Sequence, residues 1–243
     1  MRISHFLARC GFGSRRQCEE FVKQGRVLVN GEVTTDLARQ VEPGADHVEI
    51  DGRVAMLAAQ HLTLALHKPP EVMVTRRDPQ GRRTVYDMLP PEAAPRANEL
   101  VYAGRLDFLT SGLLIMTTDG VLVNHLTHPS RHVEKAYLVA TSRSLLADEI
   151  GRICSGIELD DGPVQPCTMT AMAPTGRGGR IPRYEIVLRE GRNRQVRRMI
   201  EAVDARVMSL CRTRVGGLTL QKLGIAEGEV KELTPDQIAL LRE

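Results

Sequence analysis

The sequence lacks the features that would place a chain in a membrane, outside the cell or on a nucleotide cofactor. No apolar run approaches the roughly eighteen residues that span a bilayer, and the opening residues are too short and too interrupted for a secretory signal. No Gly-x-Gly-x-x-Gly segment follows a predicted strand, and no Gly-Lys-Ser/Thr phosphate loop is present. We therefore expect a cytoplasmic protein with no nucleotide cofactor and no membrane contact.

Thiol and metal chemistry are also poorly supported. The five cysteines are odd in number and scattered, without a Cys-x-x-Cys pair, so we expect neither a disulfide framework nor a thiolate zinc site. His125, His128 and His132 have a spacing that suggests zinc. Pro129, however, interrupts any helix that would bring the three imidazoles to one face. We expect no metal.

The composition is that of a folded protein with two concentrations of positive charge. The 243 residues are 42% apolar and 26% charged, which is enough for a sizeable core in one or two domains, and we expect two. Net charge is only +3, yet residues 1–31 carry six basic against two acidic residues, and residues 176–214 carry eleven arginines against four acidic residues. Two separated basic regions favour a phosphate-rich partner, although solvated faces would give the same pattern.

The first fifty-odd residues have the pattern of a small α/β domain. Ser14 to Gln17 has the form of a capping box and Gly25 supplies a stop, which predicts a helix over 15–24. Asn30-Gly31 and Asp51-Gly52 each predict a hairpin. Arg15 and Arg16 lie in the first helical turn, near Arg26, where a phosphate could bridge them. The segment resembles the S-four-type RNA-binding motif, which implies an RNA-binding domain over residues 1–55.

A linker is predicted at 55–62, followed by a second domain over residues 62–243. Irregular spacing and adjacent strand pairs indicate an α+β domain with a mixed, largely antiparallel sheet and flanking helices. The predicted strands cover 63–67, 71–76, 112–118, 134–141, 164–172, 183–189 and 206–214. The predicted helices cover 120–127, 143–153, 193–203 and 235–242.

One carboxylate in this domain has the setting of a nucleophile. Asp107 stands beside Arg105 and between apolar residues, on a loop that leads directly into an apolar strand. Such a carboxylate could be held rigid, ionised and largely dry. By itself, however, the stretch favours a loop cap whose surface ion pair is Arg105.

Other segments strengthen the first interpretation. In order, His67-Lys68-Pro69, Asp78 to Val85, Gly104 to Asp107, Glu134 to Val139 and Glu190 to Met199 resemble the RsuA/RluB family of ribosomal pseudouridine synthases over essentially the whole chain. The resemblance implies that a uridine of ribosomal RNA is isomerised to pseudouridine by an enzyme that needs no cofactor.

The resemblance also implies roles for individual residues. Asp107 would be the nucleophile, Tyr137 would stack on the target base and serve as a general base, and Arg197 would hold the carboxylate charged by its own opposite charge. Residue type alone leaves Tyr137 as a packed strand residue and Arg197 as a phosphate contact. We expect RNA-binding roles for Arg15, Arg16, Arg26, Arg105, Arg192, Arg194 and Arg198.

Several alternatives remain at this point. Large-subunit RNA is preferred over small-subunit RNA because of the segments at 159–163 and 190–194, while Cys211 and Lys231 lie where family members vary. A non-catalytic RNA-binding or ribosome-assembly protein could keep the same scaffold. A hydrolase acting on a glycosidic bond would need a second carboxylate, for which Asp87 and Asp119 are the candidates. We expect a monomer.

Overall fold

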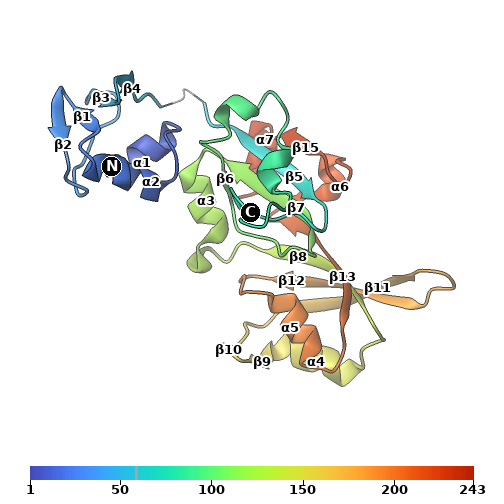
Figure 1. Ribbon diagram of the computed structural model, residues 1–243. Helices are drawn as coiled ribbons and strands as arrows, with labels where there is room; N and C mark the ends of the chain where they lie inside the picture. Colours follow the sequence, from blue (N-terminus) through green and yellow to red (C-terminus); the bar gives the residue numbers. More distant parts are fainter. Residues whose placement is uncertain (58–59) are drawn as a thin grey trace. The chain divides into compact units, whose positions relative to one another are not determined.

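The computed structural model describes residues 1–57 and 60–243, which divide into two compact units (Figure 1). Unit 1 is Met1–Leu62 with Leu89–Val101 and Thr117–Asp119, and unit 2 is Thr63–Met88 with Tyr102–Met116 and Gly120–Glu243. The predicted linker at 55–62 includes Ala58 and Ala59, which lie outside the described residues. The domain limits inferred from sequence, 1–55 and 62–243, stay a prediction, because unit 1 also takes in two later segments.

Unit 1 places two helices against a four-stranded sheet. The helices are α1 (Ile3–Arg9) and α2 (Arg15–Lys23), and the sheet order is β2-β1-β3-β4. The strands are β1 (Val27–Val29), β2 (Glu32–Thr34), β3 (Val48–Ile50) and β4 (Arg53–Val54), and the short helix η2 (Ala94–Arg96) belongs to the same unit. The apolar sides of both helices and of β1 and β3 form one core, with Ile3, Leu7 and Val22 fully buried.

The local signals in unit 1 are confirmed. The Ser14 hydroxyl accepts from the Gln17 amide, and the Gln17 side chain accepts from the Ser14 amide, which is the predicted capping box. β1 and β2 pair antiparallel around Asn30-Gly31, and β3 and β4 pair around Asp51-Gly52. All four turn residues have positive φ, as hairpins closed by Asn-Gly and Asp-Gly require.

Unit 2 is built on a sheet that has nine strands in the described part of the chain. Its main path is β11-β12-β8-β13-β7-β5-β15, with β14 beside β13 and β6 beside β7 (Figure 1). The strands are β5 (Thr63–Lys68), β6 (Val101–Tyr102), β7 (Ser111–Thr117), β8 (Lys135–Thr141), β11 (Thr168–Thr175), β12 (Ile181–Leu188), β13 (Val207–Val215), β14 (Leu218–Thr219) and β15 (Val230–Glu232). β13 pairs parallel with β7 and antiparallel with β8. The predicted α+β class with a mixed, largely antiparallel sheet is confirmed.

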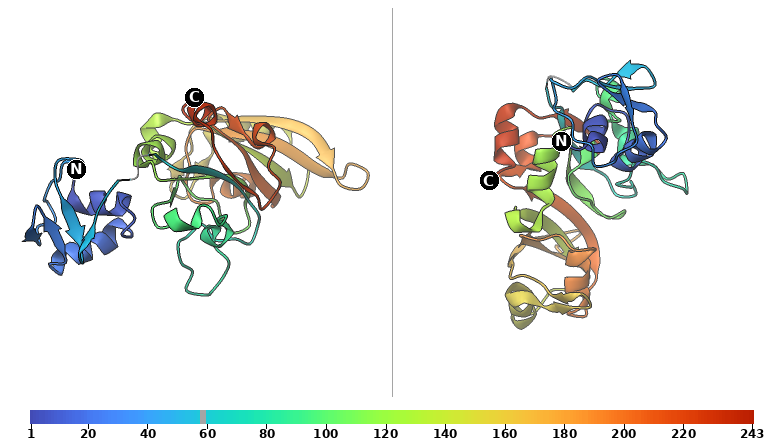
Figure 2. Two further views of the ribbon diagram at one scale, coloured as in Figure 1. Left: turned by 90° about the horizontal axis from the view of Figure 1, so that it is seen from above. Right: turned by 90° about the vertical axis from the view of Figure 1, so that its left-hand side faces the viewer.

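Helices cover this sheet over two apolar cores. They are α3 (Gly120–Thr127), α4 (Ala147–Gly156), α5 (Gln195–Glu201), α6 (Leu220–Leu223) and α7 (Pro235–Leu240), with the short helices η1 (Val85–Met88) and η3 (Pro129–Arg131). One core joins α4 and α5 to β8, β12 and β13, and the other joins α3 and α7 to β5 and β7. A small hairpin, β9 (Glu158–Leu159) with β10 (Gly162–Pro163), follows α4. The β11–β12 hairpin extends outward from the sheet (Figure 2).

Three sequence predictions need correction. The strand predicted at 164–172 lies later in the chain, as β11 at Thr168–Thr175. The predicted strand at 71–76 is wrong, because this segment forms only an isolated bridge between Met73 and Thr84. Glu71 has φ +62 and its amide donates to the Phe108 carbonyl, so the chain leaves the extended path at the start of the segment. Beyond the segment, the buried Asp78 carboxylate holds a loop by accepting from the amides of Gln80 and Arg82 and from the Arg82 guanidinium. The predicted helix at 143–153 begins later, at Ala147, because Leu146 is extended and its amide donates to Glu149. No helix in the described residues is long and apolar enough to cross a membrane.

Candidate active site

Asp107 lies on the loop between β6 and β7, and this loop is pinned on both sides. The Thr110 amide donates to the Asp107 carbonyl at 3.0 Å, and the Glu71 amide donates to the Phe108 carbonyl at 2.7 Å. The strand that follows is almost wholly buried, so the loop starts from a rigid support. The Asp107 side chain is 30% exposed, which makes the carboxylate more open than the largely dry group that the sequence predicted.

Arg197 reaches this loop from the first turns of α5. Its Nη2 donates to the Leu109 carbonyl at 3.1 Å and to Thr110 Oγ1 at 3.4 Å. Its Nε lies 4.0 Å from Oδ2 of Asp107, and the guanidinium is 9% exposed. Burial lowers the pKa of Arg197, the neighbouring Arg194 charge lowers it further, and Asp107 opposes both. An arginine remains charged under such shifts, so a buried cation faces the half-buried carboxylate.

Tyr137 lies on β8 and lines the same hollow as Asp107. The hollow is lined by Arg105, Leu106, Asp107, Thr110, Tyr137, Leu188, Arg192, Arg194, Gln195, Val196 and Leu210. It therefore brings together loop 104–110, strand β8 and the start of α5, three segments that are far apart in the sequence. The hollow is small, with a cavity volume of about 60 Å³.

Lys68 supports the Asp107 loop from below and was not assigned a role from the sequence. It ends β5 with its side chain fully buried, and its ammonium donates to the Pro69 carbonyl at 2.7 Å and to the Phe108 carbonyl at 3.4 Å. Burial lowers the pKa of Lys68 to about 8, and the negative charge of Asp107 opposes that shift. The available signal was a lysine closing an apolar strand before Pro69.

Gln195 is a second residue without a predicted role. It lines the hollow and is 4% exposed. Its Oε1 accepts from the Arg192 amide at 3.0 Å, and its Nε2 donates to Glu190 at 2.6 Å. Gln195 thus orders the turn that leads into α5, and its presence within the Glu190 to Met199 motif was the signal that could have identified it.

The predicted RNA-binding arginines fall into two groups. Arg15, Arg16, Arg105 and Arg194 are exposed and have no side-chain partner among the described residues, and Arg105 and Arg194 stand at the rim of the hollow. The others are held by protein groups. Arg26 pairs with both oxygens of Asp51, Arg198 pairs with both oxygens of Asp161 at 2.8 and 3.1 Å, and Arg192 donates to the Gly162 and Pro163 carbonyls. Arg192 and Arg198 thereby fasten the β9–β10 hairpin to α5.

The alternative carboxylates and the histidine triplet lie elsewhere. Asp87 accepts from the Thr84 amide and hydroxyl, and neither Asp87 nor Asp119 is among the described residues that line the hollow. A hydrolase that pairs Asp107 with one of them therefore has no geometric support. His128 caps η3 by accepting from the Ser130 amide, and residues 1–57 and 60–243 contain no metal-binding group of three ligands.

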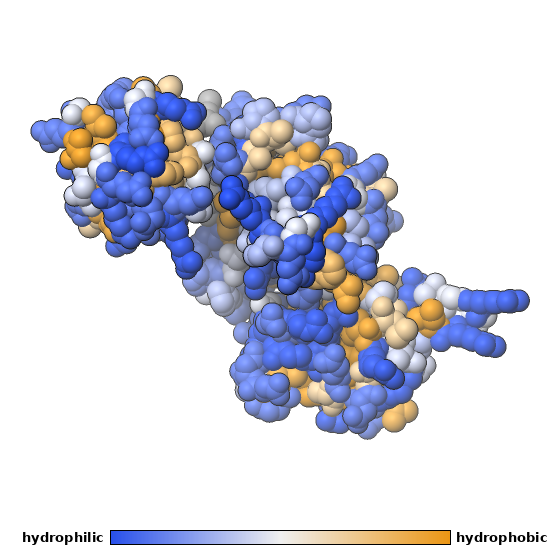
Figure 3. Space-filling model, in the orientation of Figure 1, coloured by the Kyte–Doolittle hydropathy of each residue, from blue (hydrophilic) through white to orange (hydrophobic). Residues whose placement is uncertain are grey.

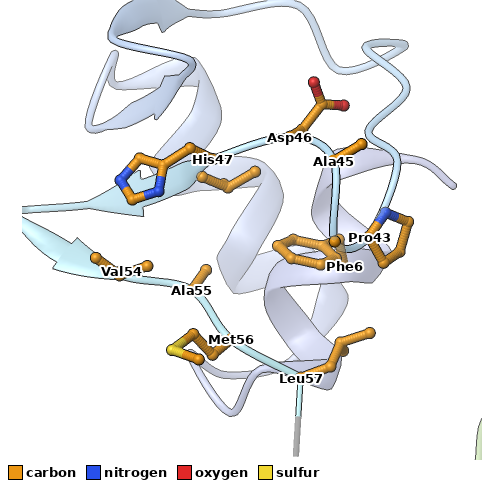
Figure 4. A pocket seen from close by; sticks show the side chains of 11 residues that line it. Phe6, Pro43, Ala45, Asp46, His47, Val54, Ala55, Met56 and Leu57 are labelled. Atoms are coloured by element: carbon orange, nitrogen blue, oxygen red, sulfur yellow. The ribbon is translucent and has the colours of Figure 1, made fainter.

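A larger hollow, of about 580 Å³, lies in unit 1 and is not a catalytic candidate. Figure 4 shows Phe6, Val54, Ala55, Met56 and Leu57 around it. Its walls are mainly apolar, and no arginine stands beside a carboxylate there. The 60 Å³ hollow has the convergent polar groups expected of an active site, so we take it as the candidate in place of the larger hollow.

Comparisons with known proteins find relatives for both parts of the chain. A family model described as RNA pseudouridylate synthase matches residues 62–202, and one described as S4 domain matches residues 1–47. The chain is 41% identical to ribosomal large subunit pseudouridine synthase B of Vibrio vulnificus (strain CMCP6) over 246 residues, which cover 100% of this chain and 74% of that protein. It is 39% identical to the protein of the same name from Escherichia coli (strain K12), with coverage of 100% and 82%. A solved structure described as pseudouridylate synthase aligns with a TM-score of 0.68 and 27% identity over 99% of each chain.

Proposed function

The chain belongs to the RNA pseudouridylate synthase family, and from this premise we propose that it isomerises a uridine of large-subunit ribosomal RNA with Asp107 as nucleophile. The observation that carries the proposal is the single hollow in which Asp107, Tyr137 and the start of α5 meet, with Arg197 buried behind the carboxylate. The relatives named for the large subunit align over the whole chain, which favours that RNA over the small-subunit alternative.

In the proposed reaction the bond from uracil nitrogen 1 to ribose carbon 1′ breaks, and the base turns. A bond then forms from carbon 5 to carbon 1′. The proton on carbon 5 leaves, and nitrogen 1 ends with a proton, so atoms and electrons balance without a co-reactant. Asp107 could attack carbon 1′, add to carbon 6 of the base, or remove the proton at carbon 2′, and each route needs its carboxylate beside the same nucleoside.

Arg197 and Tyr137 would serve this step in different ways. The hydrogen bonds from Arg197 to Leu109 and Thr110 fix the loop that presents Asp107, which preserves the direction of attack. Tyr137 offers a ring face for an extruded pyrimidine and a hydroxyl for the proton that carbon 5 loses. The base must leave its stack, so the substrate is expected in a loop or at an exposed end of a stem.

The proposal is tested by the change Asp107→Asn, which keeps the size of the side chain and removes its charge. Pseudouridine formation on large-subunit RNA is expected to fall by about four orders of magnitude or more, the scale seen when a nucleophile is lost. RNA affinity should stay within a few-fold of wild type. Carbodiimide primer-extension mapping of ribosomal RNA, from cells with and without each variant, measures the product and locates the nucleotide.

Asp148→Asn is the matched control, because Asp148 is an exposed carboxylate in the first turn of α4, outside the hollow. It should leave the map unchanged. Wild-type turnover in the Asp107→Asn enzyme would overturn the nucleophile assignment. An unmodified large-subunit RNA with a modified small-subunit RNA would overturn the substrate assignment alone. A non-catalytic binding protein, the remaining alternative, predicts that both maps are unchanged by loss of the wild-type chain.

A further inference from the structure

The β11–β12 hairpin forms an arm that stands clear of the rest of unit 2. The two strands pair from Thr168 opposite Val187 to Thr175 opposite Ile181, and every residue from 171 to 180 is exposed. Figure 3 shows the hairpin tip as a hydrophilic projection from the molecular surface. Because the residues at the tip of the arm are not part of an apolar core, packing does not restrict their side chains, which can contact a partner.

The arm is joined to the candidate active site by a continuous strand. β12 pairs with β8, and Ile186 lies opposite Tyr137 in that register. Six residues separate Ile186 from Arg180, which at about 3.3 Å per residue places the tip roughly 20 Å along the sheet from Tyr137. An RNA stem that presents its nucleotide at Tyr137 would have to extend roughly 20 Å along the sheet to reach the tip.

The charge of the arm is positive and largely uncompensated. No acidic residue occurs between Gly162 and Tyr184, whereas Arg177, Arg180 and Arg183 do. The Arg183 Nε donates to the Ala173 carbonyl at 2.9 Å and braces the arm at its bulge. Arg177 and Arg180 have no side-chain partner in the described part of the chain, so both guanidinium groups are available to an external anion.

The turn at the tip is also compact enough for an RNA sugar–phosphate backbone to come close to it. The Gly179 amide donates to the Gly176 carbonyl at 3.0 Å, and both glycines have positive φ, which gives a compact turn. A Cβ placed on Gly178 would meet nothing within 4 Å, so this face of the turn is open. Arginines beside an open glycine turn suit bidentate contacts to phosphate oxygens, and the absence of an aromatic residue from 171–180 argues against base stacking.

We propose that the tip of the arm, residues 175–180, binds the sugar–phosphate backbone of the substrate RNA through Arg177 and Arg180, at a distance from the target nucleotide. This inference rests on the proposed function for the identity of the RNA, but not for the contact itself. The arm holds the flanking RNA in position and contributes affinity without reading sequence.

The test uses a double variant that carries both Arg177→Gln and Arg180→Gln. Its affinity for a transcript of the large-subunit ribosomal RNA is compared with that of the wild type. Loss of two phosphate contacts should make the slope of log affinity against log salt less negative by about 1.4–1.8 and weaken binding by tens of fold at 0.1 M salt. Pseudouridine formation should be slower because KM rises, while kcat stays near the wild-type value. The pair Arg177→Lys with Arg180→Lys keeps the charges and should retain most of the slope.

Arg152→Gln with Lys222→Gln is the charge-matched control, because both residues are exposed in unit 2 outside the arm and the hollow. Its slope should equal that of the wild type. An unchanged slope in the double variant of Arg177 and Arg180 overturns the inference. The inference also fails if the double variant binds RNA as the wild type does but no longer binds an acidic protein. If the wild type forms no pseudouridine but the slope still depends on the arm, the proposed function fails and the inference stands.

Discussion

At the scale of single residues, Arg197 uses only part of its hydrogen-bonding capacity within the protein. Its Nε is buried, has no hydrogen-bond partner among the described residues, and lies 4.0 Å from the Asp107 carboxylate. Leaving a buried donor unpaired costs on the order of 1–3 kcal/mol. The cost is reasonable where a carboxylate shifts during reaction, because a small movement of Asp107 toward Nε would complete the bond.

Lys68 leads to a prediction about pH. Because burial lowers the pKa of Lys68 to about 8, its ammonium loses charge as the pH rises through that value, and the positive field on Asp107 weakens with it. We expect kcat/KM to decline above about pH 8 in the wild type. In Lys68→Met the side chain is neutral at every pH, so this decline should be absent, which a pH–rate profile will show.

Deprotonation of Lys68 does not by itself favour unfolding. Between about pH 8 and the ordinary lysine value of 10.5, the folded chain holds fewer protons at Lys68 than the unfolded chain, so this group makes folding more favourable as the pH rises. Lys222→Met, which removes an exposed lysine, should keep the wild-type profile. If Lys68→Met shows the same decline above pH 8, another group titrates there.

Roles for Asp107, Tyr137 and Arg197 could be proposed from sequence because each lies in a segment that resembles a family motif, and these roles stay predictions. The pairing of the other arginines could not. Arg26 finds Asp51 and Arg198 finds Asp161, partners 25 and 37 residues away in sequence. A sequence reveals where charges occur but not which opposite charge the fold brings to them, so these arginines looked available for RNA.

At the scale of elements, the parallel contact between β7 and β13 depends on one glycine. Gly112 lies opposite Arg212 at φ +117, and a Cβ there would stand 2.3 Å from the Arg212 carbonyl oxygen. We expect Gly112→Ala to lower the free energy of unfolding by roughly 2–5 kcal/mol, from left-handed strain and a backbone clash together. Denaturant titration of the whole chain measures the change.

Gly151→Ala is the control for that experiment. Gly151 lies within α4, and a Cβ there would meet nothing within 4 Å. Alanine is the better helix former, so this variant should be more stable than the wild type by up to about 1 kcal/mol. Wild-type stability in Gly112→Ala would show that β7 and β13 separate without consequence for the fold.

Elements could be predicted where the local pattern decides the structure and not where tertiary contacts do. The helix predicted at 120–127 is α3 with the same bounds, and Leu122 and Leu126, one turn apart, form its buried face. The segment 71–76 has strand-like composition but forms no strand, because Glu71 adopts φ +62 and its amide donates to the Asp107 loop. That contact crosses 37 residues and leaves no local signal.

At the scale of the whole molecule, the exposed arginines of α2 predict how unit 1 contributes to RNA binding. Arg15→Glu with Arg16→Glu should make the salt slope of RNA affinity less negative by about 1.4–1.8, if each residue meets one phosphate. Acidic residues are favoured at a helix N-terminus, so the variant should fold at least as well as the wild type. Filter binding across a salt series measures the slope.

Arg39→Glu is the control in the same unit, since Arg39 is exposed and lies outside α2. It should change the slope by less than the α2 variant does. Equal slopes in the wild type and in the double variant of Arg15 and Arg16 would mean that these two residues do not bind RNA. That result would not bear on the proposed active site, because turnover is measured separately.

The hydrogen bond from Arg197 to the Leu109 carbonyl joins residues 88 positions apart, so it can form only late in synthesis, after α5 has been made. Chains emerge from the ribosome N-terminus first, so the module with Arg15 and Arg16 is exposed to the cell well before α5 exists. A nascent chain could therefore bind RNA through this module while the loop of Asp107 still lacks its hydrogen bond from Arg197. Premature termination at any point before α5 would yield a fragment that lacks Arg197 and its hydrogen bond to the loop of Asp107.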